Sequence, residues 1–436
     1  MNDGEFVQAA KAFAWVLMLL TGVNCSWAGT YSVTDLGVLT DLPGRTDAKP
    51  NGINAAGLVA GANVISGAYR AVLYGGTWTN LGTLGGSESL GSTLNASNQV
   101  VGSAATTSSG THAFLWTPGG TDGVVGNSQM KDLGTLGGSN SQADGINRFS
   151  RVTGYSDVSA AGKVRQHAFL YTGSTMSDIG TLLSSLPNSF GYGINASGHV
   201  TGTAYDAGYS QPHAFFYNGT TAVDIGSIGG LGATALGIND GDHIVGYYDT
   251  TNSTSHAFLY FGGTMTDLGT LGGDYSYGIG INNSNVVVGG SFVDVNNATY
   301  HAFIWSNNAL ADLNTLLDAS GAGWTLVEAR AINDAGQIVG TGTHGGVHHA
   351  FLLTPNATSL PAPTITAVIL SGPNVVISFT TVGTATYALQ TSDTVPSNTW
   401  SNVVTGALGT GSTVSVTNAG GAGLSRRFYR VSASSL

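Results

Sequence analysis

The sequence is poor in charge, and positive charge is scarcest. Charged residues make up 8% of the 436-residue chain, with 13 Lys and Arg against 24 Asp and Glu. Disordered chains are polar and highly charged, so a chain with 42% hydrophobic residues and little charge is expected to fold around a large core. Binding to a nucleic-acid backbone needs clustered cations. A net charge of −11 therefore excludes nucleic acid as the main partner.

Cysteine and long apolar runs are also nearly absent. The single cysteine, Cys25, follows the apolar run 12–23, which is too short to span a bilayer comfortably. Small residues flank Trp27 in a pattern that suits signal-peptidase cleavage, so we expect a signal peptide over 1–28. The mature chain would then have no thiol chemistry and no transmembrane segment. A buried N-terminal helix and a lipid anchor on Cys25 are the alternatives.

Glycine, by contrast, is abundant, with 66 residues, and it belongs to motifs that recur. Segments that read HAF, or RAV in the first copy, begin at Arg70, His112, His167, His213, His256, His301 and His349. Segments that read DLG or a close variant begin at Asp35, Asn80, Asp132, Asp178, Asp224, Asp267 and Asp312. A third motif pairs an Asn with a Gly seven positions later, and its Asn residues are Asn54, Asn95, Asn147, Asn195, Asn239, Asn282 and Asn333.

Each motif predicts one β-strand, with short turns between them. The third motif predicts two strands joined by a turn of Gly, Asn and Asp residues, as in 239–242. The HAF and DLG strands flank a second tight turn, which we place at Thr172-Gly173 in one repeat and at Asn218-Gly219 in the next. Each repeat is therefore expected to form four antiparallel strands.

Seven such repeats of similar length predict an all-β fold, a seven-bladed β-propeller of four-stranded blades. The first DLG segment, 31–37, has no HAF strand before it, and the last HAF segment, 349–353, has no DLG strand after it. We therefore expect the N-terminal strand to pair with the C-terminal one and close the propeller, which removes exposed sheet edges. The expected order within a blade, from the inside, is the Asn strand, the Gly strand, the HAF strand and the DLG strand.

These motifs resemble those of the HAF repeat family of bacterial extracellular repeat proteins. The resemblance covers about three quarters of the chain, from Asp35 to Leu353. It implies secretion from a bacterium to the extracellular space or cell surface, and a repeat architecture. It brings no catalytic residue and no ligand. The first repeat departs from the pattern at Arg70 and Asn80, and the last at Asn314.

The C-terminal part lacks the repeats. We expect a propeller over 29–355, a Pro/Ser/Thr-rich linker over 356–364, and a small β-sandwich over 365–436. The last segment alternates apolar and polar residues and has no cysteine. It is similar to the immunoglobulin-like and fibronectin-III-like modules at the ends of secreted bacterial proteins. The sequence does not fix whether this module anchors the protein.

A histidine and an aspartate recur together, which could indicate a catalytic pair. A two-residue turn would place His167 directly opposite Asp178, close enough for an imidazole–carboxylate contact. A catalytic pair is needed once, beside a nucleophile, but this pair repeats without one. We therefore interpret the pairs as structural; besides His112 with Asp132 they are His167 with Asp178, His213 with Asp224, His256 with Asp267, His301 with Asp312, and His349 with Asp35.

The sequence predicts no cofactor and no catalytic or metal-binding motif. The stretch 239–242 (NDGD) is similar to part of a calcium loop, but the required spacing and the terminal Glu are absent. Calcium at this stretch remains the one metal hypothesis.

The segments between the Gly strand and the HAF strand differ from repeat to repeat. Variable loops on a rigid scaffold often carry binding sites. Several of these segments place an aromatic residue near an acid, which suits sugar stacking with hydrogen bonding but also suits ordinary exposed loops. The candidate binding residues are Tyr155, Asp157, Tyr205, Asp206, Tyr248, Asp249, Phe292 and Asp294.

The favoured function is a secreted, non-enzymatic scaffold, monomeric, which binds an extracellular polysaccharide or a protein through loops on one propeller face. One alternative is a propeller-type glycan lyase or hydrolase. It requires two carboxylates from different blades to meet in a pocket at the mouth. Another alternative is a structural component of a matrix or surface layer. The sequence does not identify the ligand.

Overall fold

The structure is a computed structural model. It describes the chain from Thr30 to Ser435, apart from residues 109, 161–162, 183–184, 357–362, 383–384, 393–400 and 421–427. The expected signal peptide, 1–28, lies outside the described residues. No helix within the described ranges is long and apolar enough to cross a membrane.

Seven antiparallel sheets of four strands make up most of the chain. The first contains β2 (Lys49–Ile53), β3 (Val59–Ile65), β4 (Ala68–Tyr74) and β5 (Trp78–Asn80). The second contains β6 (Gly85–Leu94), β7 (Val100–Thr106), β8 (Thr111–Trp116) and β9 (Met130–Asp132). The third contains β10 (Ser141–Ile146), β11 (Val152–Ala160), β12 (Lys163–Tyr171) and β13 (Met176–Asp178).

The remaining sheets continue the pattern. The fourth contains β14 (Asn188–Ile194), β15 (Val200–Tyr205), β16 (Pro212–Tyr217) and β17 (Ala222–Asp224). The fifth contains β18 (Ala233–Ile238), β19 (Ile244–Asp249), β20 (Ser255–Phe261) and β21 (Thr264–Gly269). The sixth contains β22 (Ser276–Ile281), β23 (Val287–Phe292), β24 (Tyr300–Ser306) and β25 (Ala309–Asp312). The seventh contains β26 (Trp324–Ile332), β27 (Ile338–His344), β28 (Val347–Pro355) and β1 (Tyr31–Val38).

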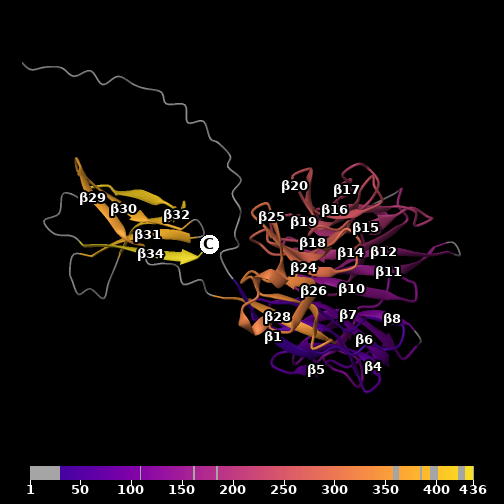
Figure 1. Ribbon diagram of the computed structural model, residues 1–436. Helices are drawn as coiled ribbons and strands as arrows, with labels where there is room; N and C mark the ends of the chain where they lie inside the picture. The colour runs from indigo at the N-terminus through magenta and orange to yellow at the C-terminus, as the bar shows by residue number, and fades with distance from the viewer. Residues whose placement is uncertain are drawn as a thin grey trace, which may run out of the picture.

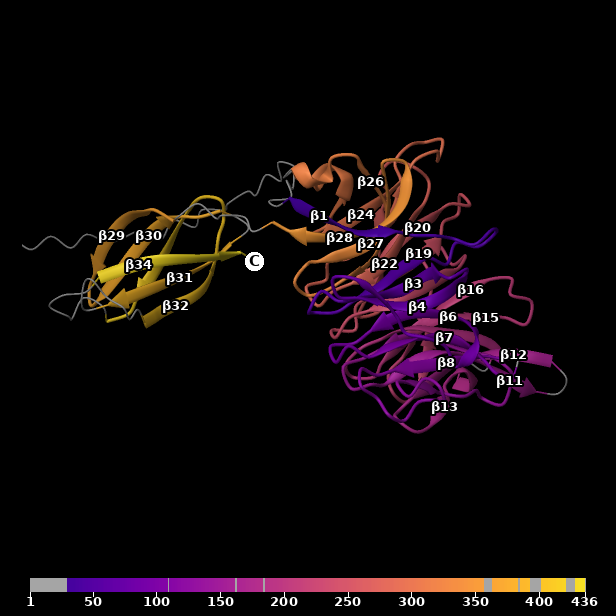
Figure 2. The ribbon, with the colours of Figure 1, turned by 90° about the horizontal axis from the view of Figure 1, so that it is seen from below.

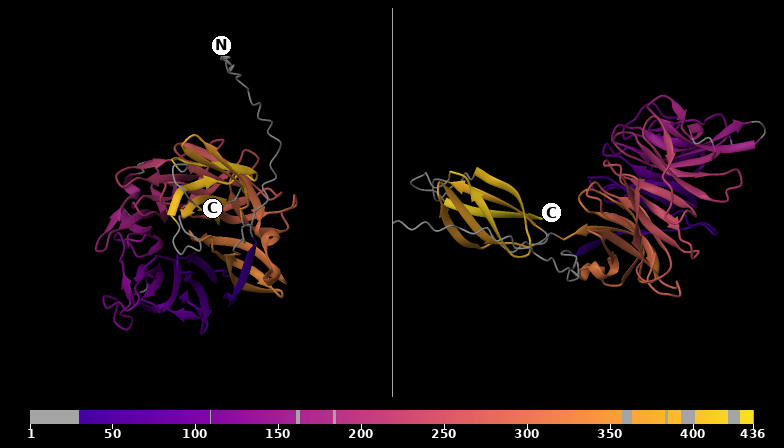
Figure 3. Two further views of the ribbon diagram at one scale, coloured as in Figure 1. Left: turned by 90° about the vertical axis from the view of Figure 1, so that its left-hand side faces the viewer. Right: turned by 90° about the horizontal axis from the view of Figure 1, so that it is seen from above.

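These sheets are arranged as a β-propeller, with successive sheets side by side around a common axis (Figures 1 and 3). The predicted strand order is confirmed, because each sheet runs from the Asn strand through the Gly and HAF strands to the DLG strand. Only short 3₁₀ helices interrupt the strands within the described residues, and they are η1 (Gly180–Leu182), η2 (Leu313–Leu316) and η3 (Ala319–Gly321). The β11–β12 hairpin extends beyond the body of the propeller (Figure 2).

The pairing of the first strand with the last HAF strand is also confirmed. Strand β1 pairs with β28 in antiparallel fashion, and Asp35 lies opposite Phe351. In Figure 1 the indigo β1 and the orange β28 are adjacent although they come from opposite ends of the propeller sequence. The seventh sheet is therefore built from both ends.

The predicted register of the HAF and DLG strands was wrong by two residues. Asp178 lies opposite Phe169, and His167 is its diagonal neighbour. The same offset occurs in the fourth sheet, where Asp224 lies opposite Phe215. The connections in these two hairpins are four residues long, 172–175 and 218–221. The HAF strands end where the prediction placed their ends, at Tyr171 and Tyr217, but the next strands begin two residues later, at Met176 and Ala222.

The HAF phenylalanine is the centre of the packing between sheets. Phe169 is fully buried and belongs to one apolar cluster with Val152 of its own sheet and Val101 of the preceding sheet. The alanine before it, Ala168, is equally buried but packs with Val200 of the following sheet. Adjacent residues of one strand thus face two different neighbours, which explains the consecutive apolar residues of this motif.

A continuous series of asparagine side chains joins the first strands of the sheets. The Nδ2 group of Asn54 donates to the carbonyl oxygen of Asn95, and the same bond repeats from each Asn to the next, at 2.8 to 3.2 Å. The series ends with Asn333, which donates back to the carbonyl oxygen of Asn54 at 2.9 Å. All seven residues are buried. Their Oδ1 atoms accept backbone N–H groups of their own turns, as from Ala56 and Leu58 to Asn54.

Each first strand contains a β-bulge at one repeated position, three residues before the Asn. The bulge residues are Asn51, Ser92, Asp144, Tyr192, Leu236, Ile279 and Arg330. The repeated Gly of the second strand lies against this bulge. A Cβ atom on Gly154, for example, would overlap the carbonyl oxygen of Gln142, and the other six repeated glycines are in the same position. The glycine therefore permits the close approach that the bulge requires.

The C-terminal part forms two three-stranded sheets that lie apart from the propeller (Figure 2). One contains β29 (Ile365–Ser371), β30 (Asn374–Thr380) and β33 (Thr413–Asn418). The other contains β32 (Ser401–Leu408), β31 (Ala385–Ser392) and β34 (Phe428–Ser435). They share one apolar core, which includes Ile377 and Phe379 of the first sheet and Tyr387 and Leu389 of the second.

We predict that Gly154→Ala destabilises the protein, by about 1–3 kcal/mol or more, because the added methyl group would push the second strand away from the bulged first strand. Chemical denaturation followed by circular dichroism measures this loss. Gly75→Ala is the matched control, because a Cβ at Gly75 meets only Leu58 at 4.0 Å. Equal stability of the two variants would contradict the role given to the repeated glycine.

Candidate functional site

The histidine–aspartate pairs come together as contacts. Nδ1 of His167 lies 2.7 Å from Oδ2 of Asp178, and His213 and Asp224 are 2.8 Å apart at the same atoms. The other pairs, His112 with Asp132, His256 with Asp267, His301 with Asp312 and His349 with Asp35, contact at 2.7 to 3.2 Å. The first sheet has no such pair, and Arg70 there donates to the carbonyl oxygen of Ser87.

Each paired aspartate also stabilises the turn that follows it. Oδ1 of Asp224 accepts the backbone N–H of Gly226, and Oδ1 of Asp267 accepts that of Gly269. Both glycines have positive φ, which explains the Gly of the DLG motif. The carboxylate thus joins the turn to the HAF strand, and this geometry supports the structural interpretation.

The candidate functional site is a cavity of about 680 Å³ on the propeller axis. All seven bulge residues line it. The residues directly before the seven repeated asparagines are apolar and form a second ring along the axis, which we call the isoleucine ring. Six of them line the cavity, and they are Ile53, Ile146, Ile194, Ile238, Ile281 and Ile332. The same isoleucines line a second cavity, of about 290 Å³, whose other walls are the turns after the asparagines. The isoleucine ring therefore divides the axis into two compartments.

The larger cavity lies toward the propeller face that carries the variable loops, which we call the loop face. Strand β10 begins at this face, because the carbonyl oxygen of Asn140 just before it accepts the backbone N–H of Asp157 in the outer half of β11, next to the variable β11–β12 connection. It runs inward through Gln142 and Asp144 to Ile146. The bulge side chains thus lie between the loop face and the isoleucine ring.

The bulge residues divide the cavity wall chemically. In the first four sheets and the seventh they are polar or charged, as with Asn51, Ser92 and Asp144. In the fifth and sixth sheets they are Leu236 and Ile279, near the rings of Tyr247 and Tyr277, which also line the cavity. Those two rings pack edge to face at 4.9 Å. One side of the cavity offers hydrogen-bonding groups, and the opposite side offers apolar and aromatic surface.

Asp144 is a strongly perturbed carboxyl group in this cavity. Burial raises the pKa of Asp144 to about 7, while a hydrogen bond from Gln142 Nε2 to Oδ1, at 2.7 Å, acts in the opposite direction. Its Oδ2 atom is shielded and has no hydrogen-bond partner among the described residues. Burial also raises the pKa of Tyr155, to about 12, and that of Tyr192 well above its ordinary value, and the Asp144 carboxylate adds to both shifts.

A second carboxylate, Glu328 of the seventh sheet, lines the same cavity. It forms an ion pair with Arg330, the bulge residue of that sheet. Arg330 also donates from Nε to Oδ1 of Asn51 at 2.9 Å. The positive and negative charges of the seventh sheet therefore offset each other, whereas Asp144 has no cation beside it in these contacts.

The predicted loop residues do not form one site. Asp157 and Tyr248 are buried, and Asp157 accepts a hydrogen bond from Asn140 Nδ2 at 2.8 Å. Asp206 and Asp294 bind the backbone of their own loops, as in the bond from Gly208 N to Asp206. The others, Tyr155, Tyr205, Asp249 and Phe292, are partly buried. Ligand binding by this set stays a prediction, but most of its polar atoms already serve the loops.

The calcium hypothesis at 239–242 has little support in the contacts. Asp242 interacts with Asn195 and His199 of the neighbouring sheet, and Asp240 accepts the backbone N–H of Ala196. These carboxylates hold adjacent turns together.

No family model matches the chain, and no curated protein matches it. Among solved structures it is similar to the β-propeller domain of the Trilobed protease from Pyrococcus furiosus, described as having an open velcro topology. The identity is 9% and the TM-score 0.31, with 66% of this chain and 97% of that chain covered. A similarity of this degree does not establish the fold, so the architecture is inferred from the strand pairing described above.

The axial cavity was missed from the sequence, although a signal for it exists. Position three before each repeated Asn varies in charge and size, while the Asn and the residue before it hardly vary. A variable position inside a repeated motif indicates a side chain that the fold does not prescribe. The bulge that directs this side chain to the axis is not readable from the sequence pattern.

We predict that His213→Ala lowers stability without removing a specific activity. The two side chains are 34% and 43% exposed, so the pair is expected to contribute no more than about 1 kcal/mol. A double-mutant cycle with Asp224→Ala, measured by thermal or chemical unfolding, isolates this coupling. His167→Ala should cost more, because its pair is less exposed. Native stability of both histidine variants would refute the structural role.

We predict that Asp144 makes stability fall as the pH rises toward neutrality. Its pKa in the folded protein, about 7, is above the value of about 3.9 for an unfolded chain. The contribution of the protonated Asp144 to the free energy of unfolding is therefore complete below about pH 4 and is lost as the pH rises through 7. Between these values the free energy of unfolding falls with a limiting slope of about 1.4 kcal/mol per pH unit. The free energy of unfolding of the wild type relative to Asp144→Asn, followed across this range, measures the effect. A constant difference would contradict it.

Proposed function

We propose that the chain is an extracellular binding scaffold, built as a closed seven-bladed propeller followed by a β-sandwich similar to immunoglobulin-like or fibronectin-III-like modules. Closure is supported by the pairing of β1 with β28 and by the hydrogen bond from Asn333 back to Asn54. The sandwich is supported by the core shared between the two C-terminal sheets. Secretion by a bacterium is an expectation from the motifs and the N-terminal segment.

The proposed binding site is the axial cavity, with the variable loops around its mouth. The observation that carries this proposal is that all seven bulge residues, which differ between repeats, line one cavity. Strand positions that serve only the fold repeat, as the asparagines and glycines do. A cavity of about 680 Å³ is of the size that holds a small ligand or the end of a polymer.

The chemistry of the wall favours a carbohydrate. Tyr247 and Tyr277 offer aromatic faces and edges against which a sugar ring can pack, and Asn51, Ser92 and Gln142 offer hydrogen bonds on the other side. The carboxyl group of Asp144 also lines this wall, with its Oδ2 atom shielded and without a hydrogen-bond partner among the described residues. We therefore propose the end of an extracellular polysaccharide as the ligand, in preference to a protein.

Glycan cleavage is the second candidate, and one observation favours it. Asp144 and Glu328 come from different sheets and line the same cavity, as the alternative requires. A carboxyl group with a pKa of about 7 could serve as a general acid. The scaffold is preferred because Glu328 is held by Arg330 in an ion pair, which weakens it as a base. A purely structural role in a matrix, the third alternative, predicts no ligand.

A glycan array probed with the purified full-length protein tests the proposal. We expect binding to a restricted set of glycans, and Tyr277→Ala should weaken it about tenfold or more if the ring stacks on the sugar, a loss of about 1.4 kcal/mol. Phe149→Ala is the matched aromatic control, because Phe149 is exposed on the turns at the opposite face. The proposal would be contradicted if the wild type bound no glycan, or if Phe149→Ala lost binding as Tyr277→Ala does.

Incubation with each bound glycan separates binding from cleavage. A scaffold leaves the glycan intact, whereas an enzyme releases new chain ends. Release that Asp144→Asn abolishes, while binding persists, would establish the catalytic alternative.

A further inference from the structure

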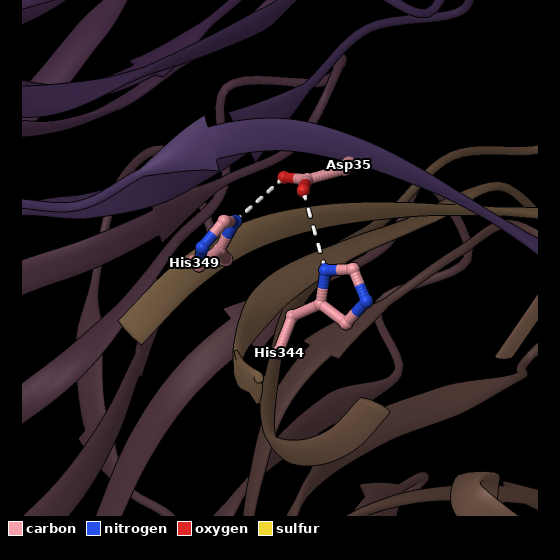
Figure 4. A group of neighbouring side chains, drawn as sticks. All are labelled: Asp35, His344 and His349. Carbon is pink, nitrogen blue, oxygen red and sulfur yellow. Dashed lines mark hydrogen bonds and ion pairs between the residues drawn. The ribbon is translucent and has the colours of Figure 1, made fainter. Parts of the chain in front are cut away.

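Three potential metal ligands meet at the outer part of the seventh sheet. Asp35 comes from β1, His344 from the end of β27 and His349 from β28 (Figure 4). Nδ1 of His349 lies 2.9 Å from Oδ1 of Asp35, and Nδ1 of His344 lies 3.6 Å from Oδ2 of the same carboxylate. All three ligand atoms lie within 4.8 Å of one another. We call this group the seam cluster.

The spacing of these atoms matches a tetrahedral metal site. Ligand atoms about 2.0–2.1 Å from a zinc ion in tetrahedral geometry are about 3.3 Å from one another. The distance from His349 to Oδ1 of Asp35, 2.9 Å, and that from His344 to Oδ2, 3.6 Å, are close to that value, and one ligand atom of each residue lies within 4.8 Å of the others. Both imidazoles are on the same side of the carboxylate in Figure 4, so small ring rotations would direct them to one point.

Neighbouring side chains hold the ligands in place. The ring of Trp324 stacks on His344 with the centroids 4.8 Å apart and the planes at 4°, and it packs edge to face on His349 at 5.8 Å. Oδ1 of Asp35 also accepts the backbone N–H of Gly37 at 2.7 Å.

The third ligand distinguishes the seam cluster from the other histidine–aspartate pairs. Within the ranges that the structure describes, this is the one group of three His, Cys, Asp or Glu side chains with ligand spacing. The pair in the sixth sheet, His301 with Asp312, has the same contact without a second imidazole. A single histidine–aspartate pair is enough to connect two neighbouring strands. The added histidine, in the sheet that joins the two ends, therefore calls for another explanation.

We propose that Asp35, His344 and His349 bind one divalent transition metal ion and that the ion fastens the first strand to the last two strands of the propeller. Two imidazoles and one carboxylate are the ligand types that zinc accepts, with a fourth position left for water. The net negative charge of this ligand set suits a divalent cation. The ion would link residues 314 positions apart in the sequence.

Calorimetric titration of the untagged full-length protein with zinc chloride, after treatment with a chelator, tests the proposal. We expect one zinc ion per chain and a rise in the melting temperature on binding. His344→Ala should weaken zinc binding by about tenfold or more, since even the loss of an outer-shell partner of a metal ligand has such an effect. His348→Ala is the matched control, because His348 lies next to His349 in β28 but outside the cluster.

Two results would overturn the proposal. One is the absence of zinc binding to the wild type, and the other is unchanged binding by His344→Ala, which would indicate adventitious surface histidines. If His344→Ala does not fold, Asp35→Asn provides the test, because an amide oxygen still accepts a hydrogen bond from His349 but is a poor zinc ligand. Hydrogen exchange adds a readout of location, since zinc should slow exchange of the β1 amides, 31–38, more than those of β4 in the wild type.

Discussion

The architecture depends on one buried amide, repeated seven times. In most sheets the Oδ1 atom of the repeated asparagine accepts two backbone N–H groups from the turn that follows it. In every sheet its Nδ2 group donates to the carbonyl oxygen of the repeated asparagine in the next sheet. The same side chain therefore shapes a turn and joins two sheets. A single four-stranded sheet cannot bury both of its faces, so every sheet needs two neighbours. The asparagines fix where those neighbours meet, and the phenylalanines of the HAF strands fill the space farther out.

This arrangement separates the positions that build the fold from those that are free to vary. The ring asparagine, the isoleucine before it and the glycine across from the bulge have prescribed contacts in each sheet. The bulge residue does not, because its side chain lines the axial cavity. Each repeat can thus contribute a different group, from Asp144 to Leu236, without disturbing the packing. Burial of a carboxyl oxygen without a hydrogen-bond partner, as at Asp144, lowers the stability of the folded chain. The fold does not require this residue, so the loss of stability is attributable to the site.

The sequence was sufficient to predict the strands, their order and the joining of the two ends, because these follow from motifs that recur at regular spacing. It was also sufficient for the histidine–aspartate contacts, but not for their register. A connection two residues longer than predicted placed Asp178 opposite Phe169 and not opposite His167, and turn length is poorly determined by the residues alone. The cavity and the seam cluster were beyond prediction for a different reason. They depend on contacts between residues that are far apart in the sequence, such as that of Asp35 with His344, which no local pattern encodes.

The sharing of the seventh sheet between both ends has a consequence for how the molecule forms. Strands within the first six sheets pair with partners nearby in the sequence, whereas β1 waits for β28, more than 300 positions later. Closing so long a loop has a large entropic cost and is slow compared with local hairpin formation. The pairing of β1 with β28 should therefore be the last part of the propeller to form and the first to separate under force or heat. The seventh sheet is thus complete only after β28, the last strand of the propeller sequence, has been synthesised.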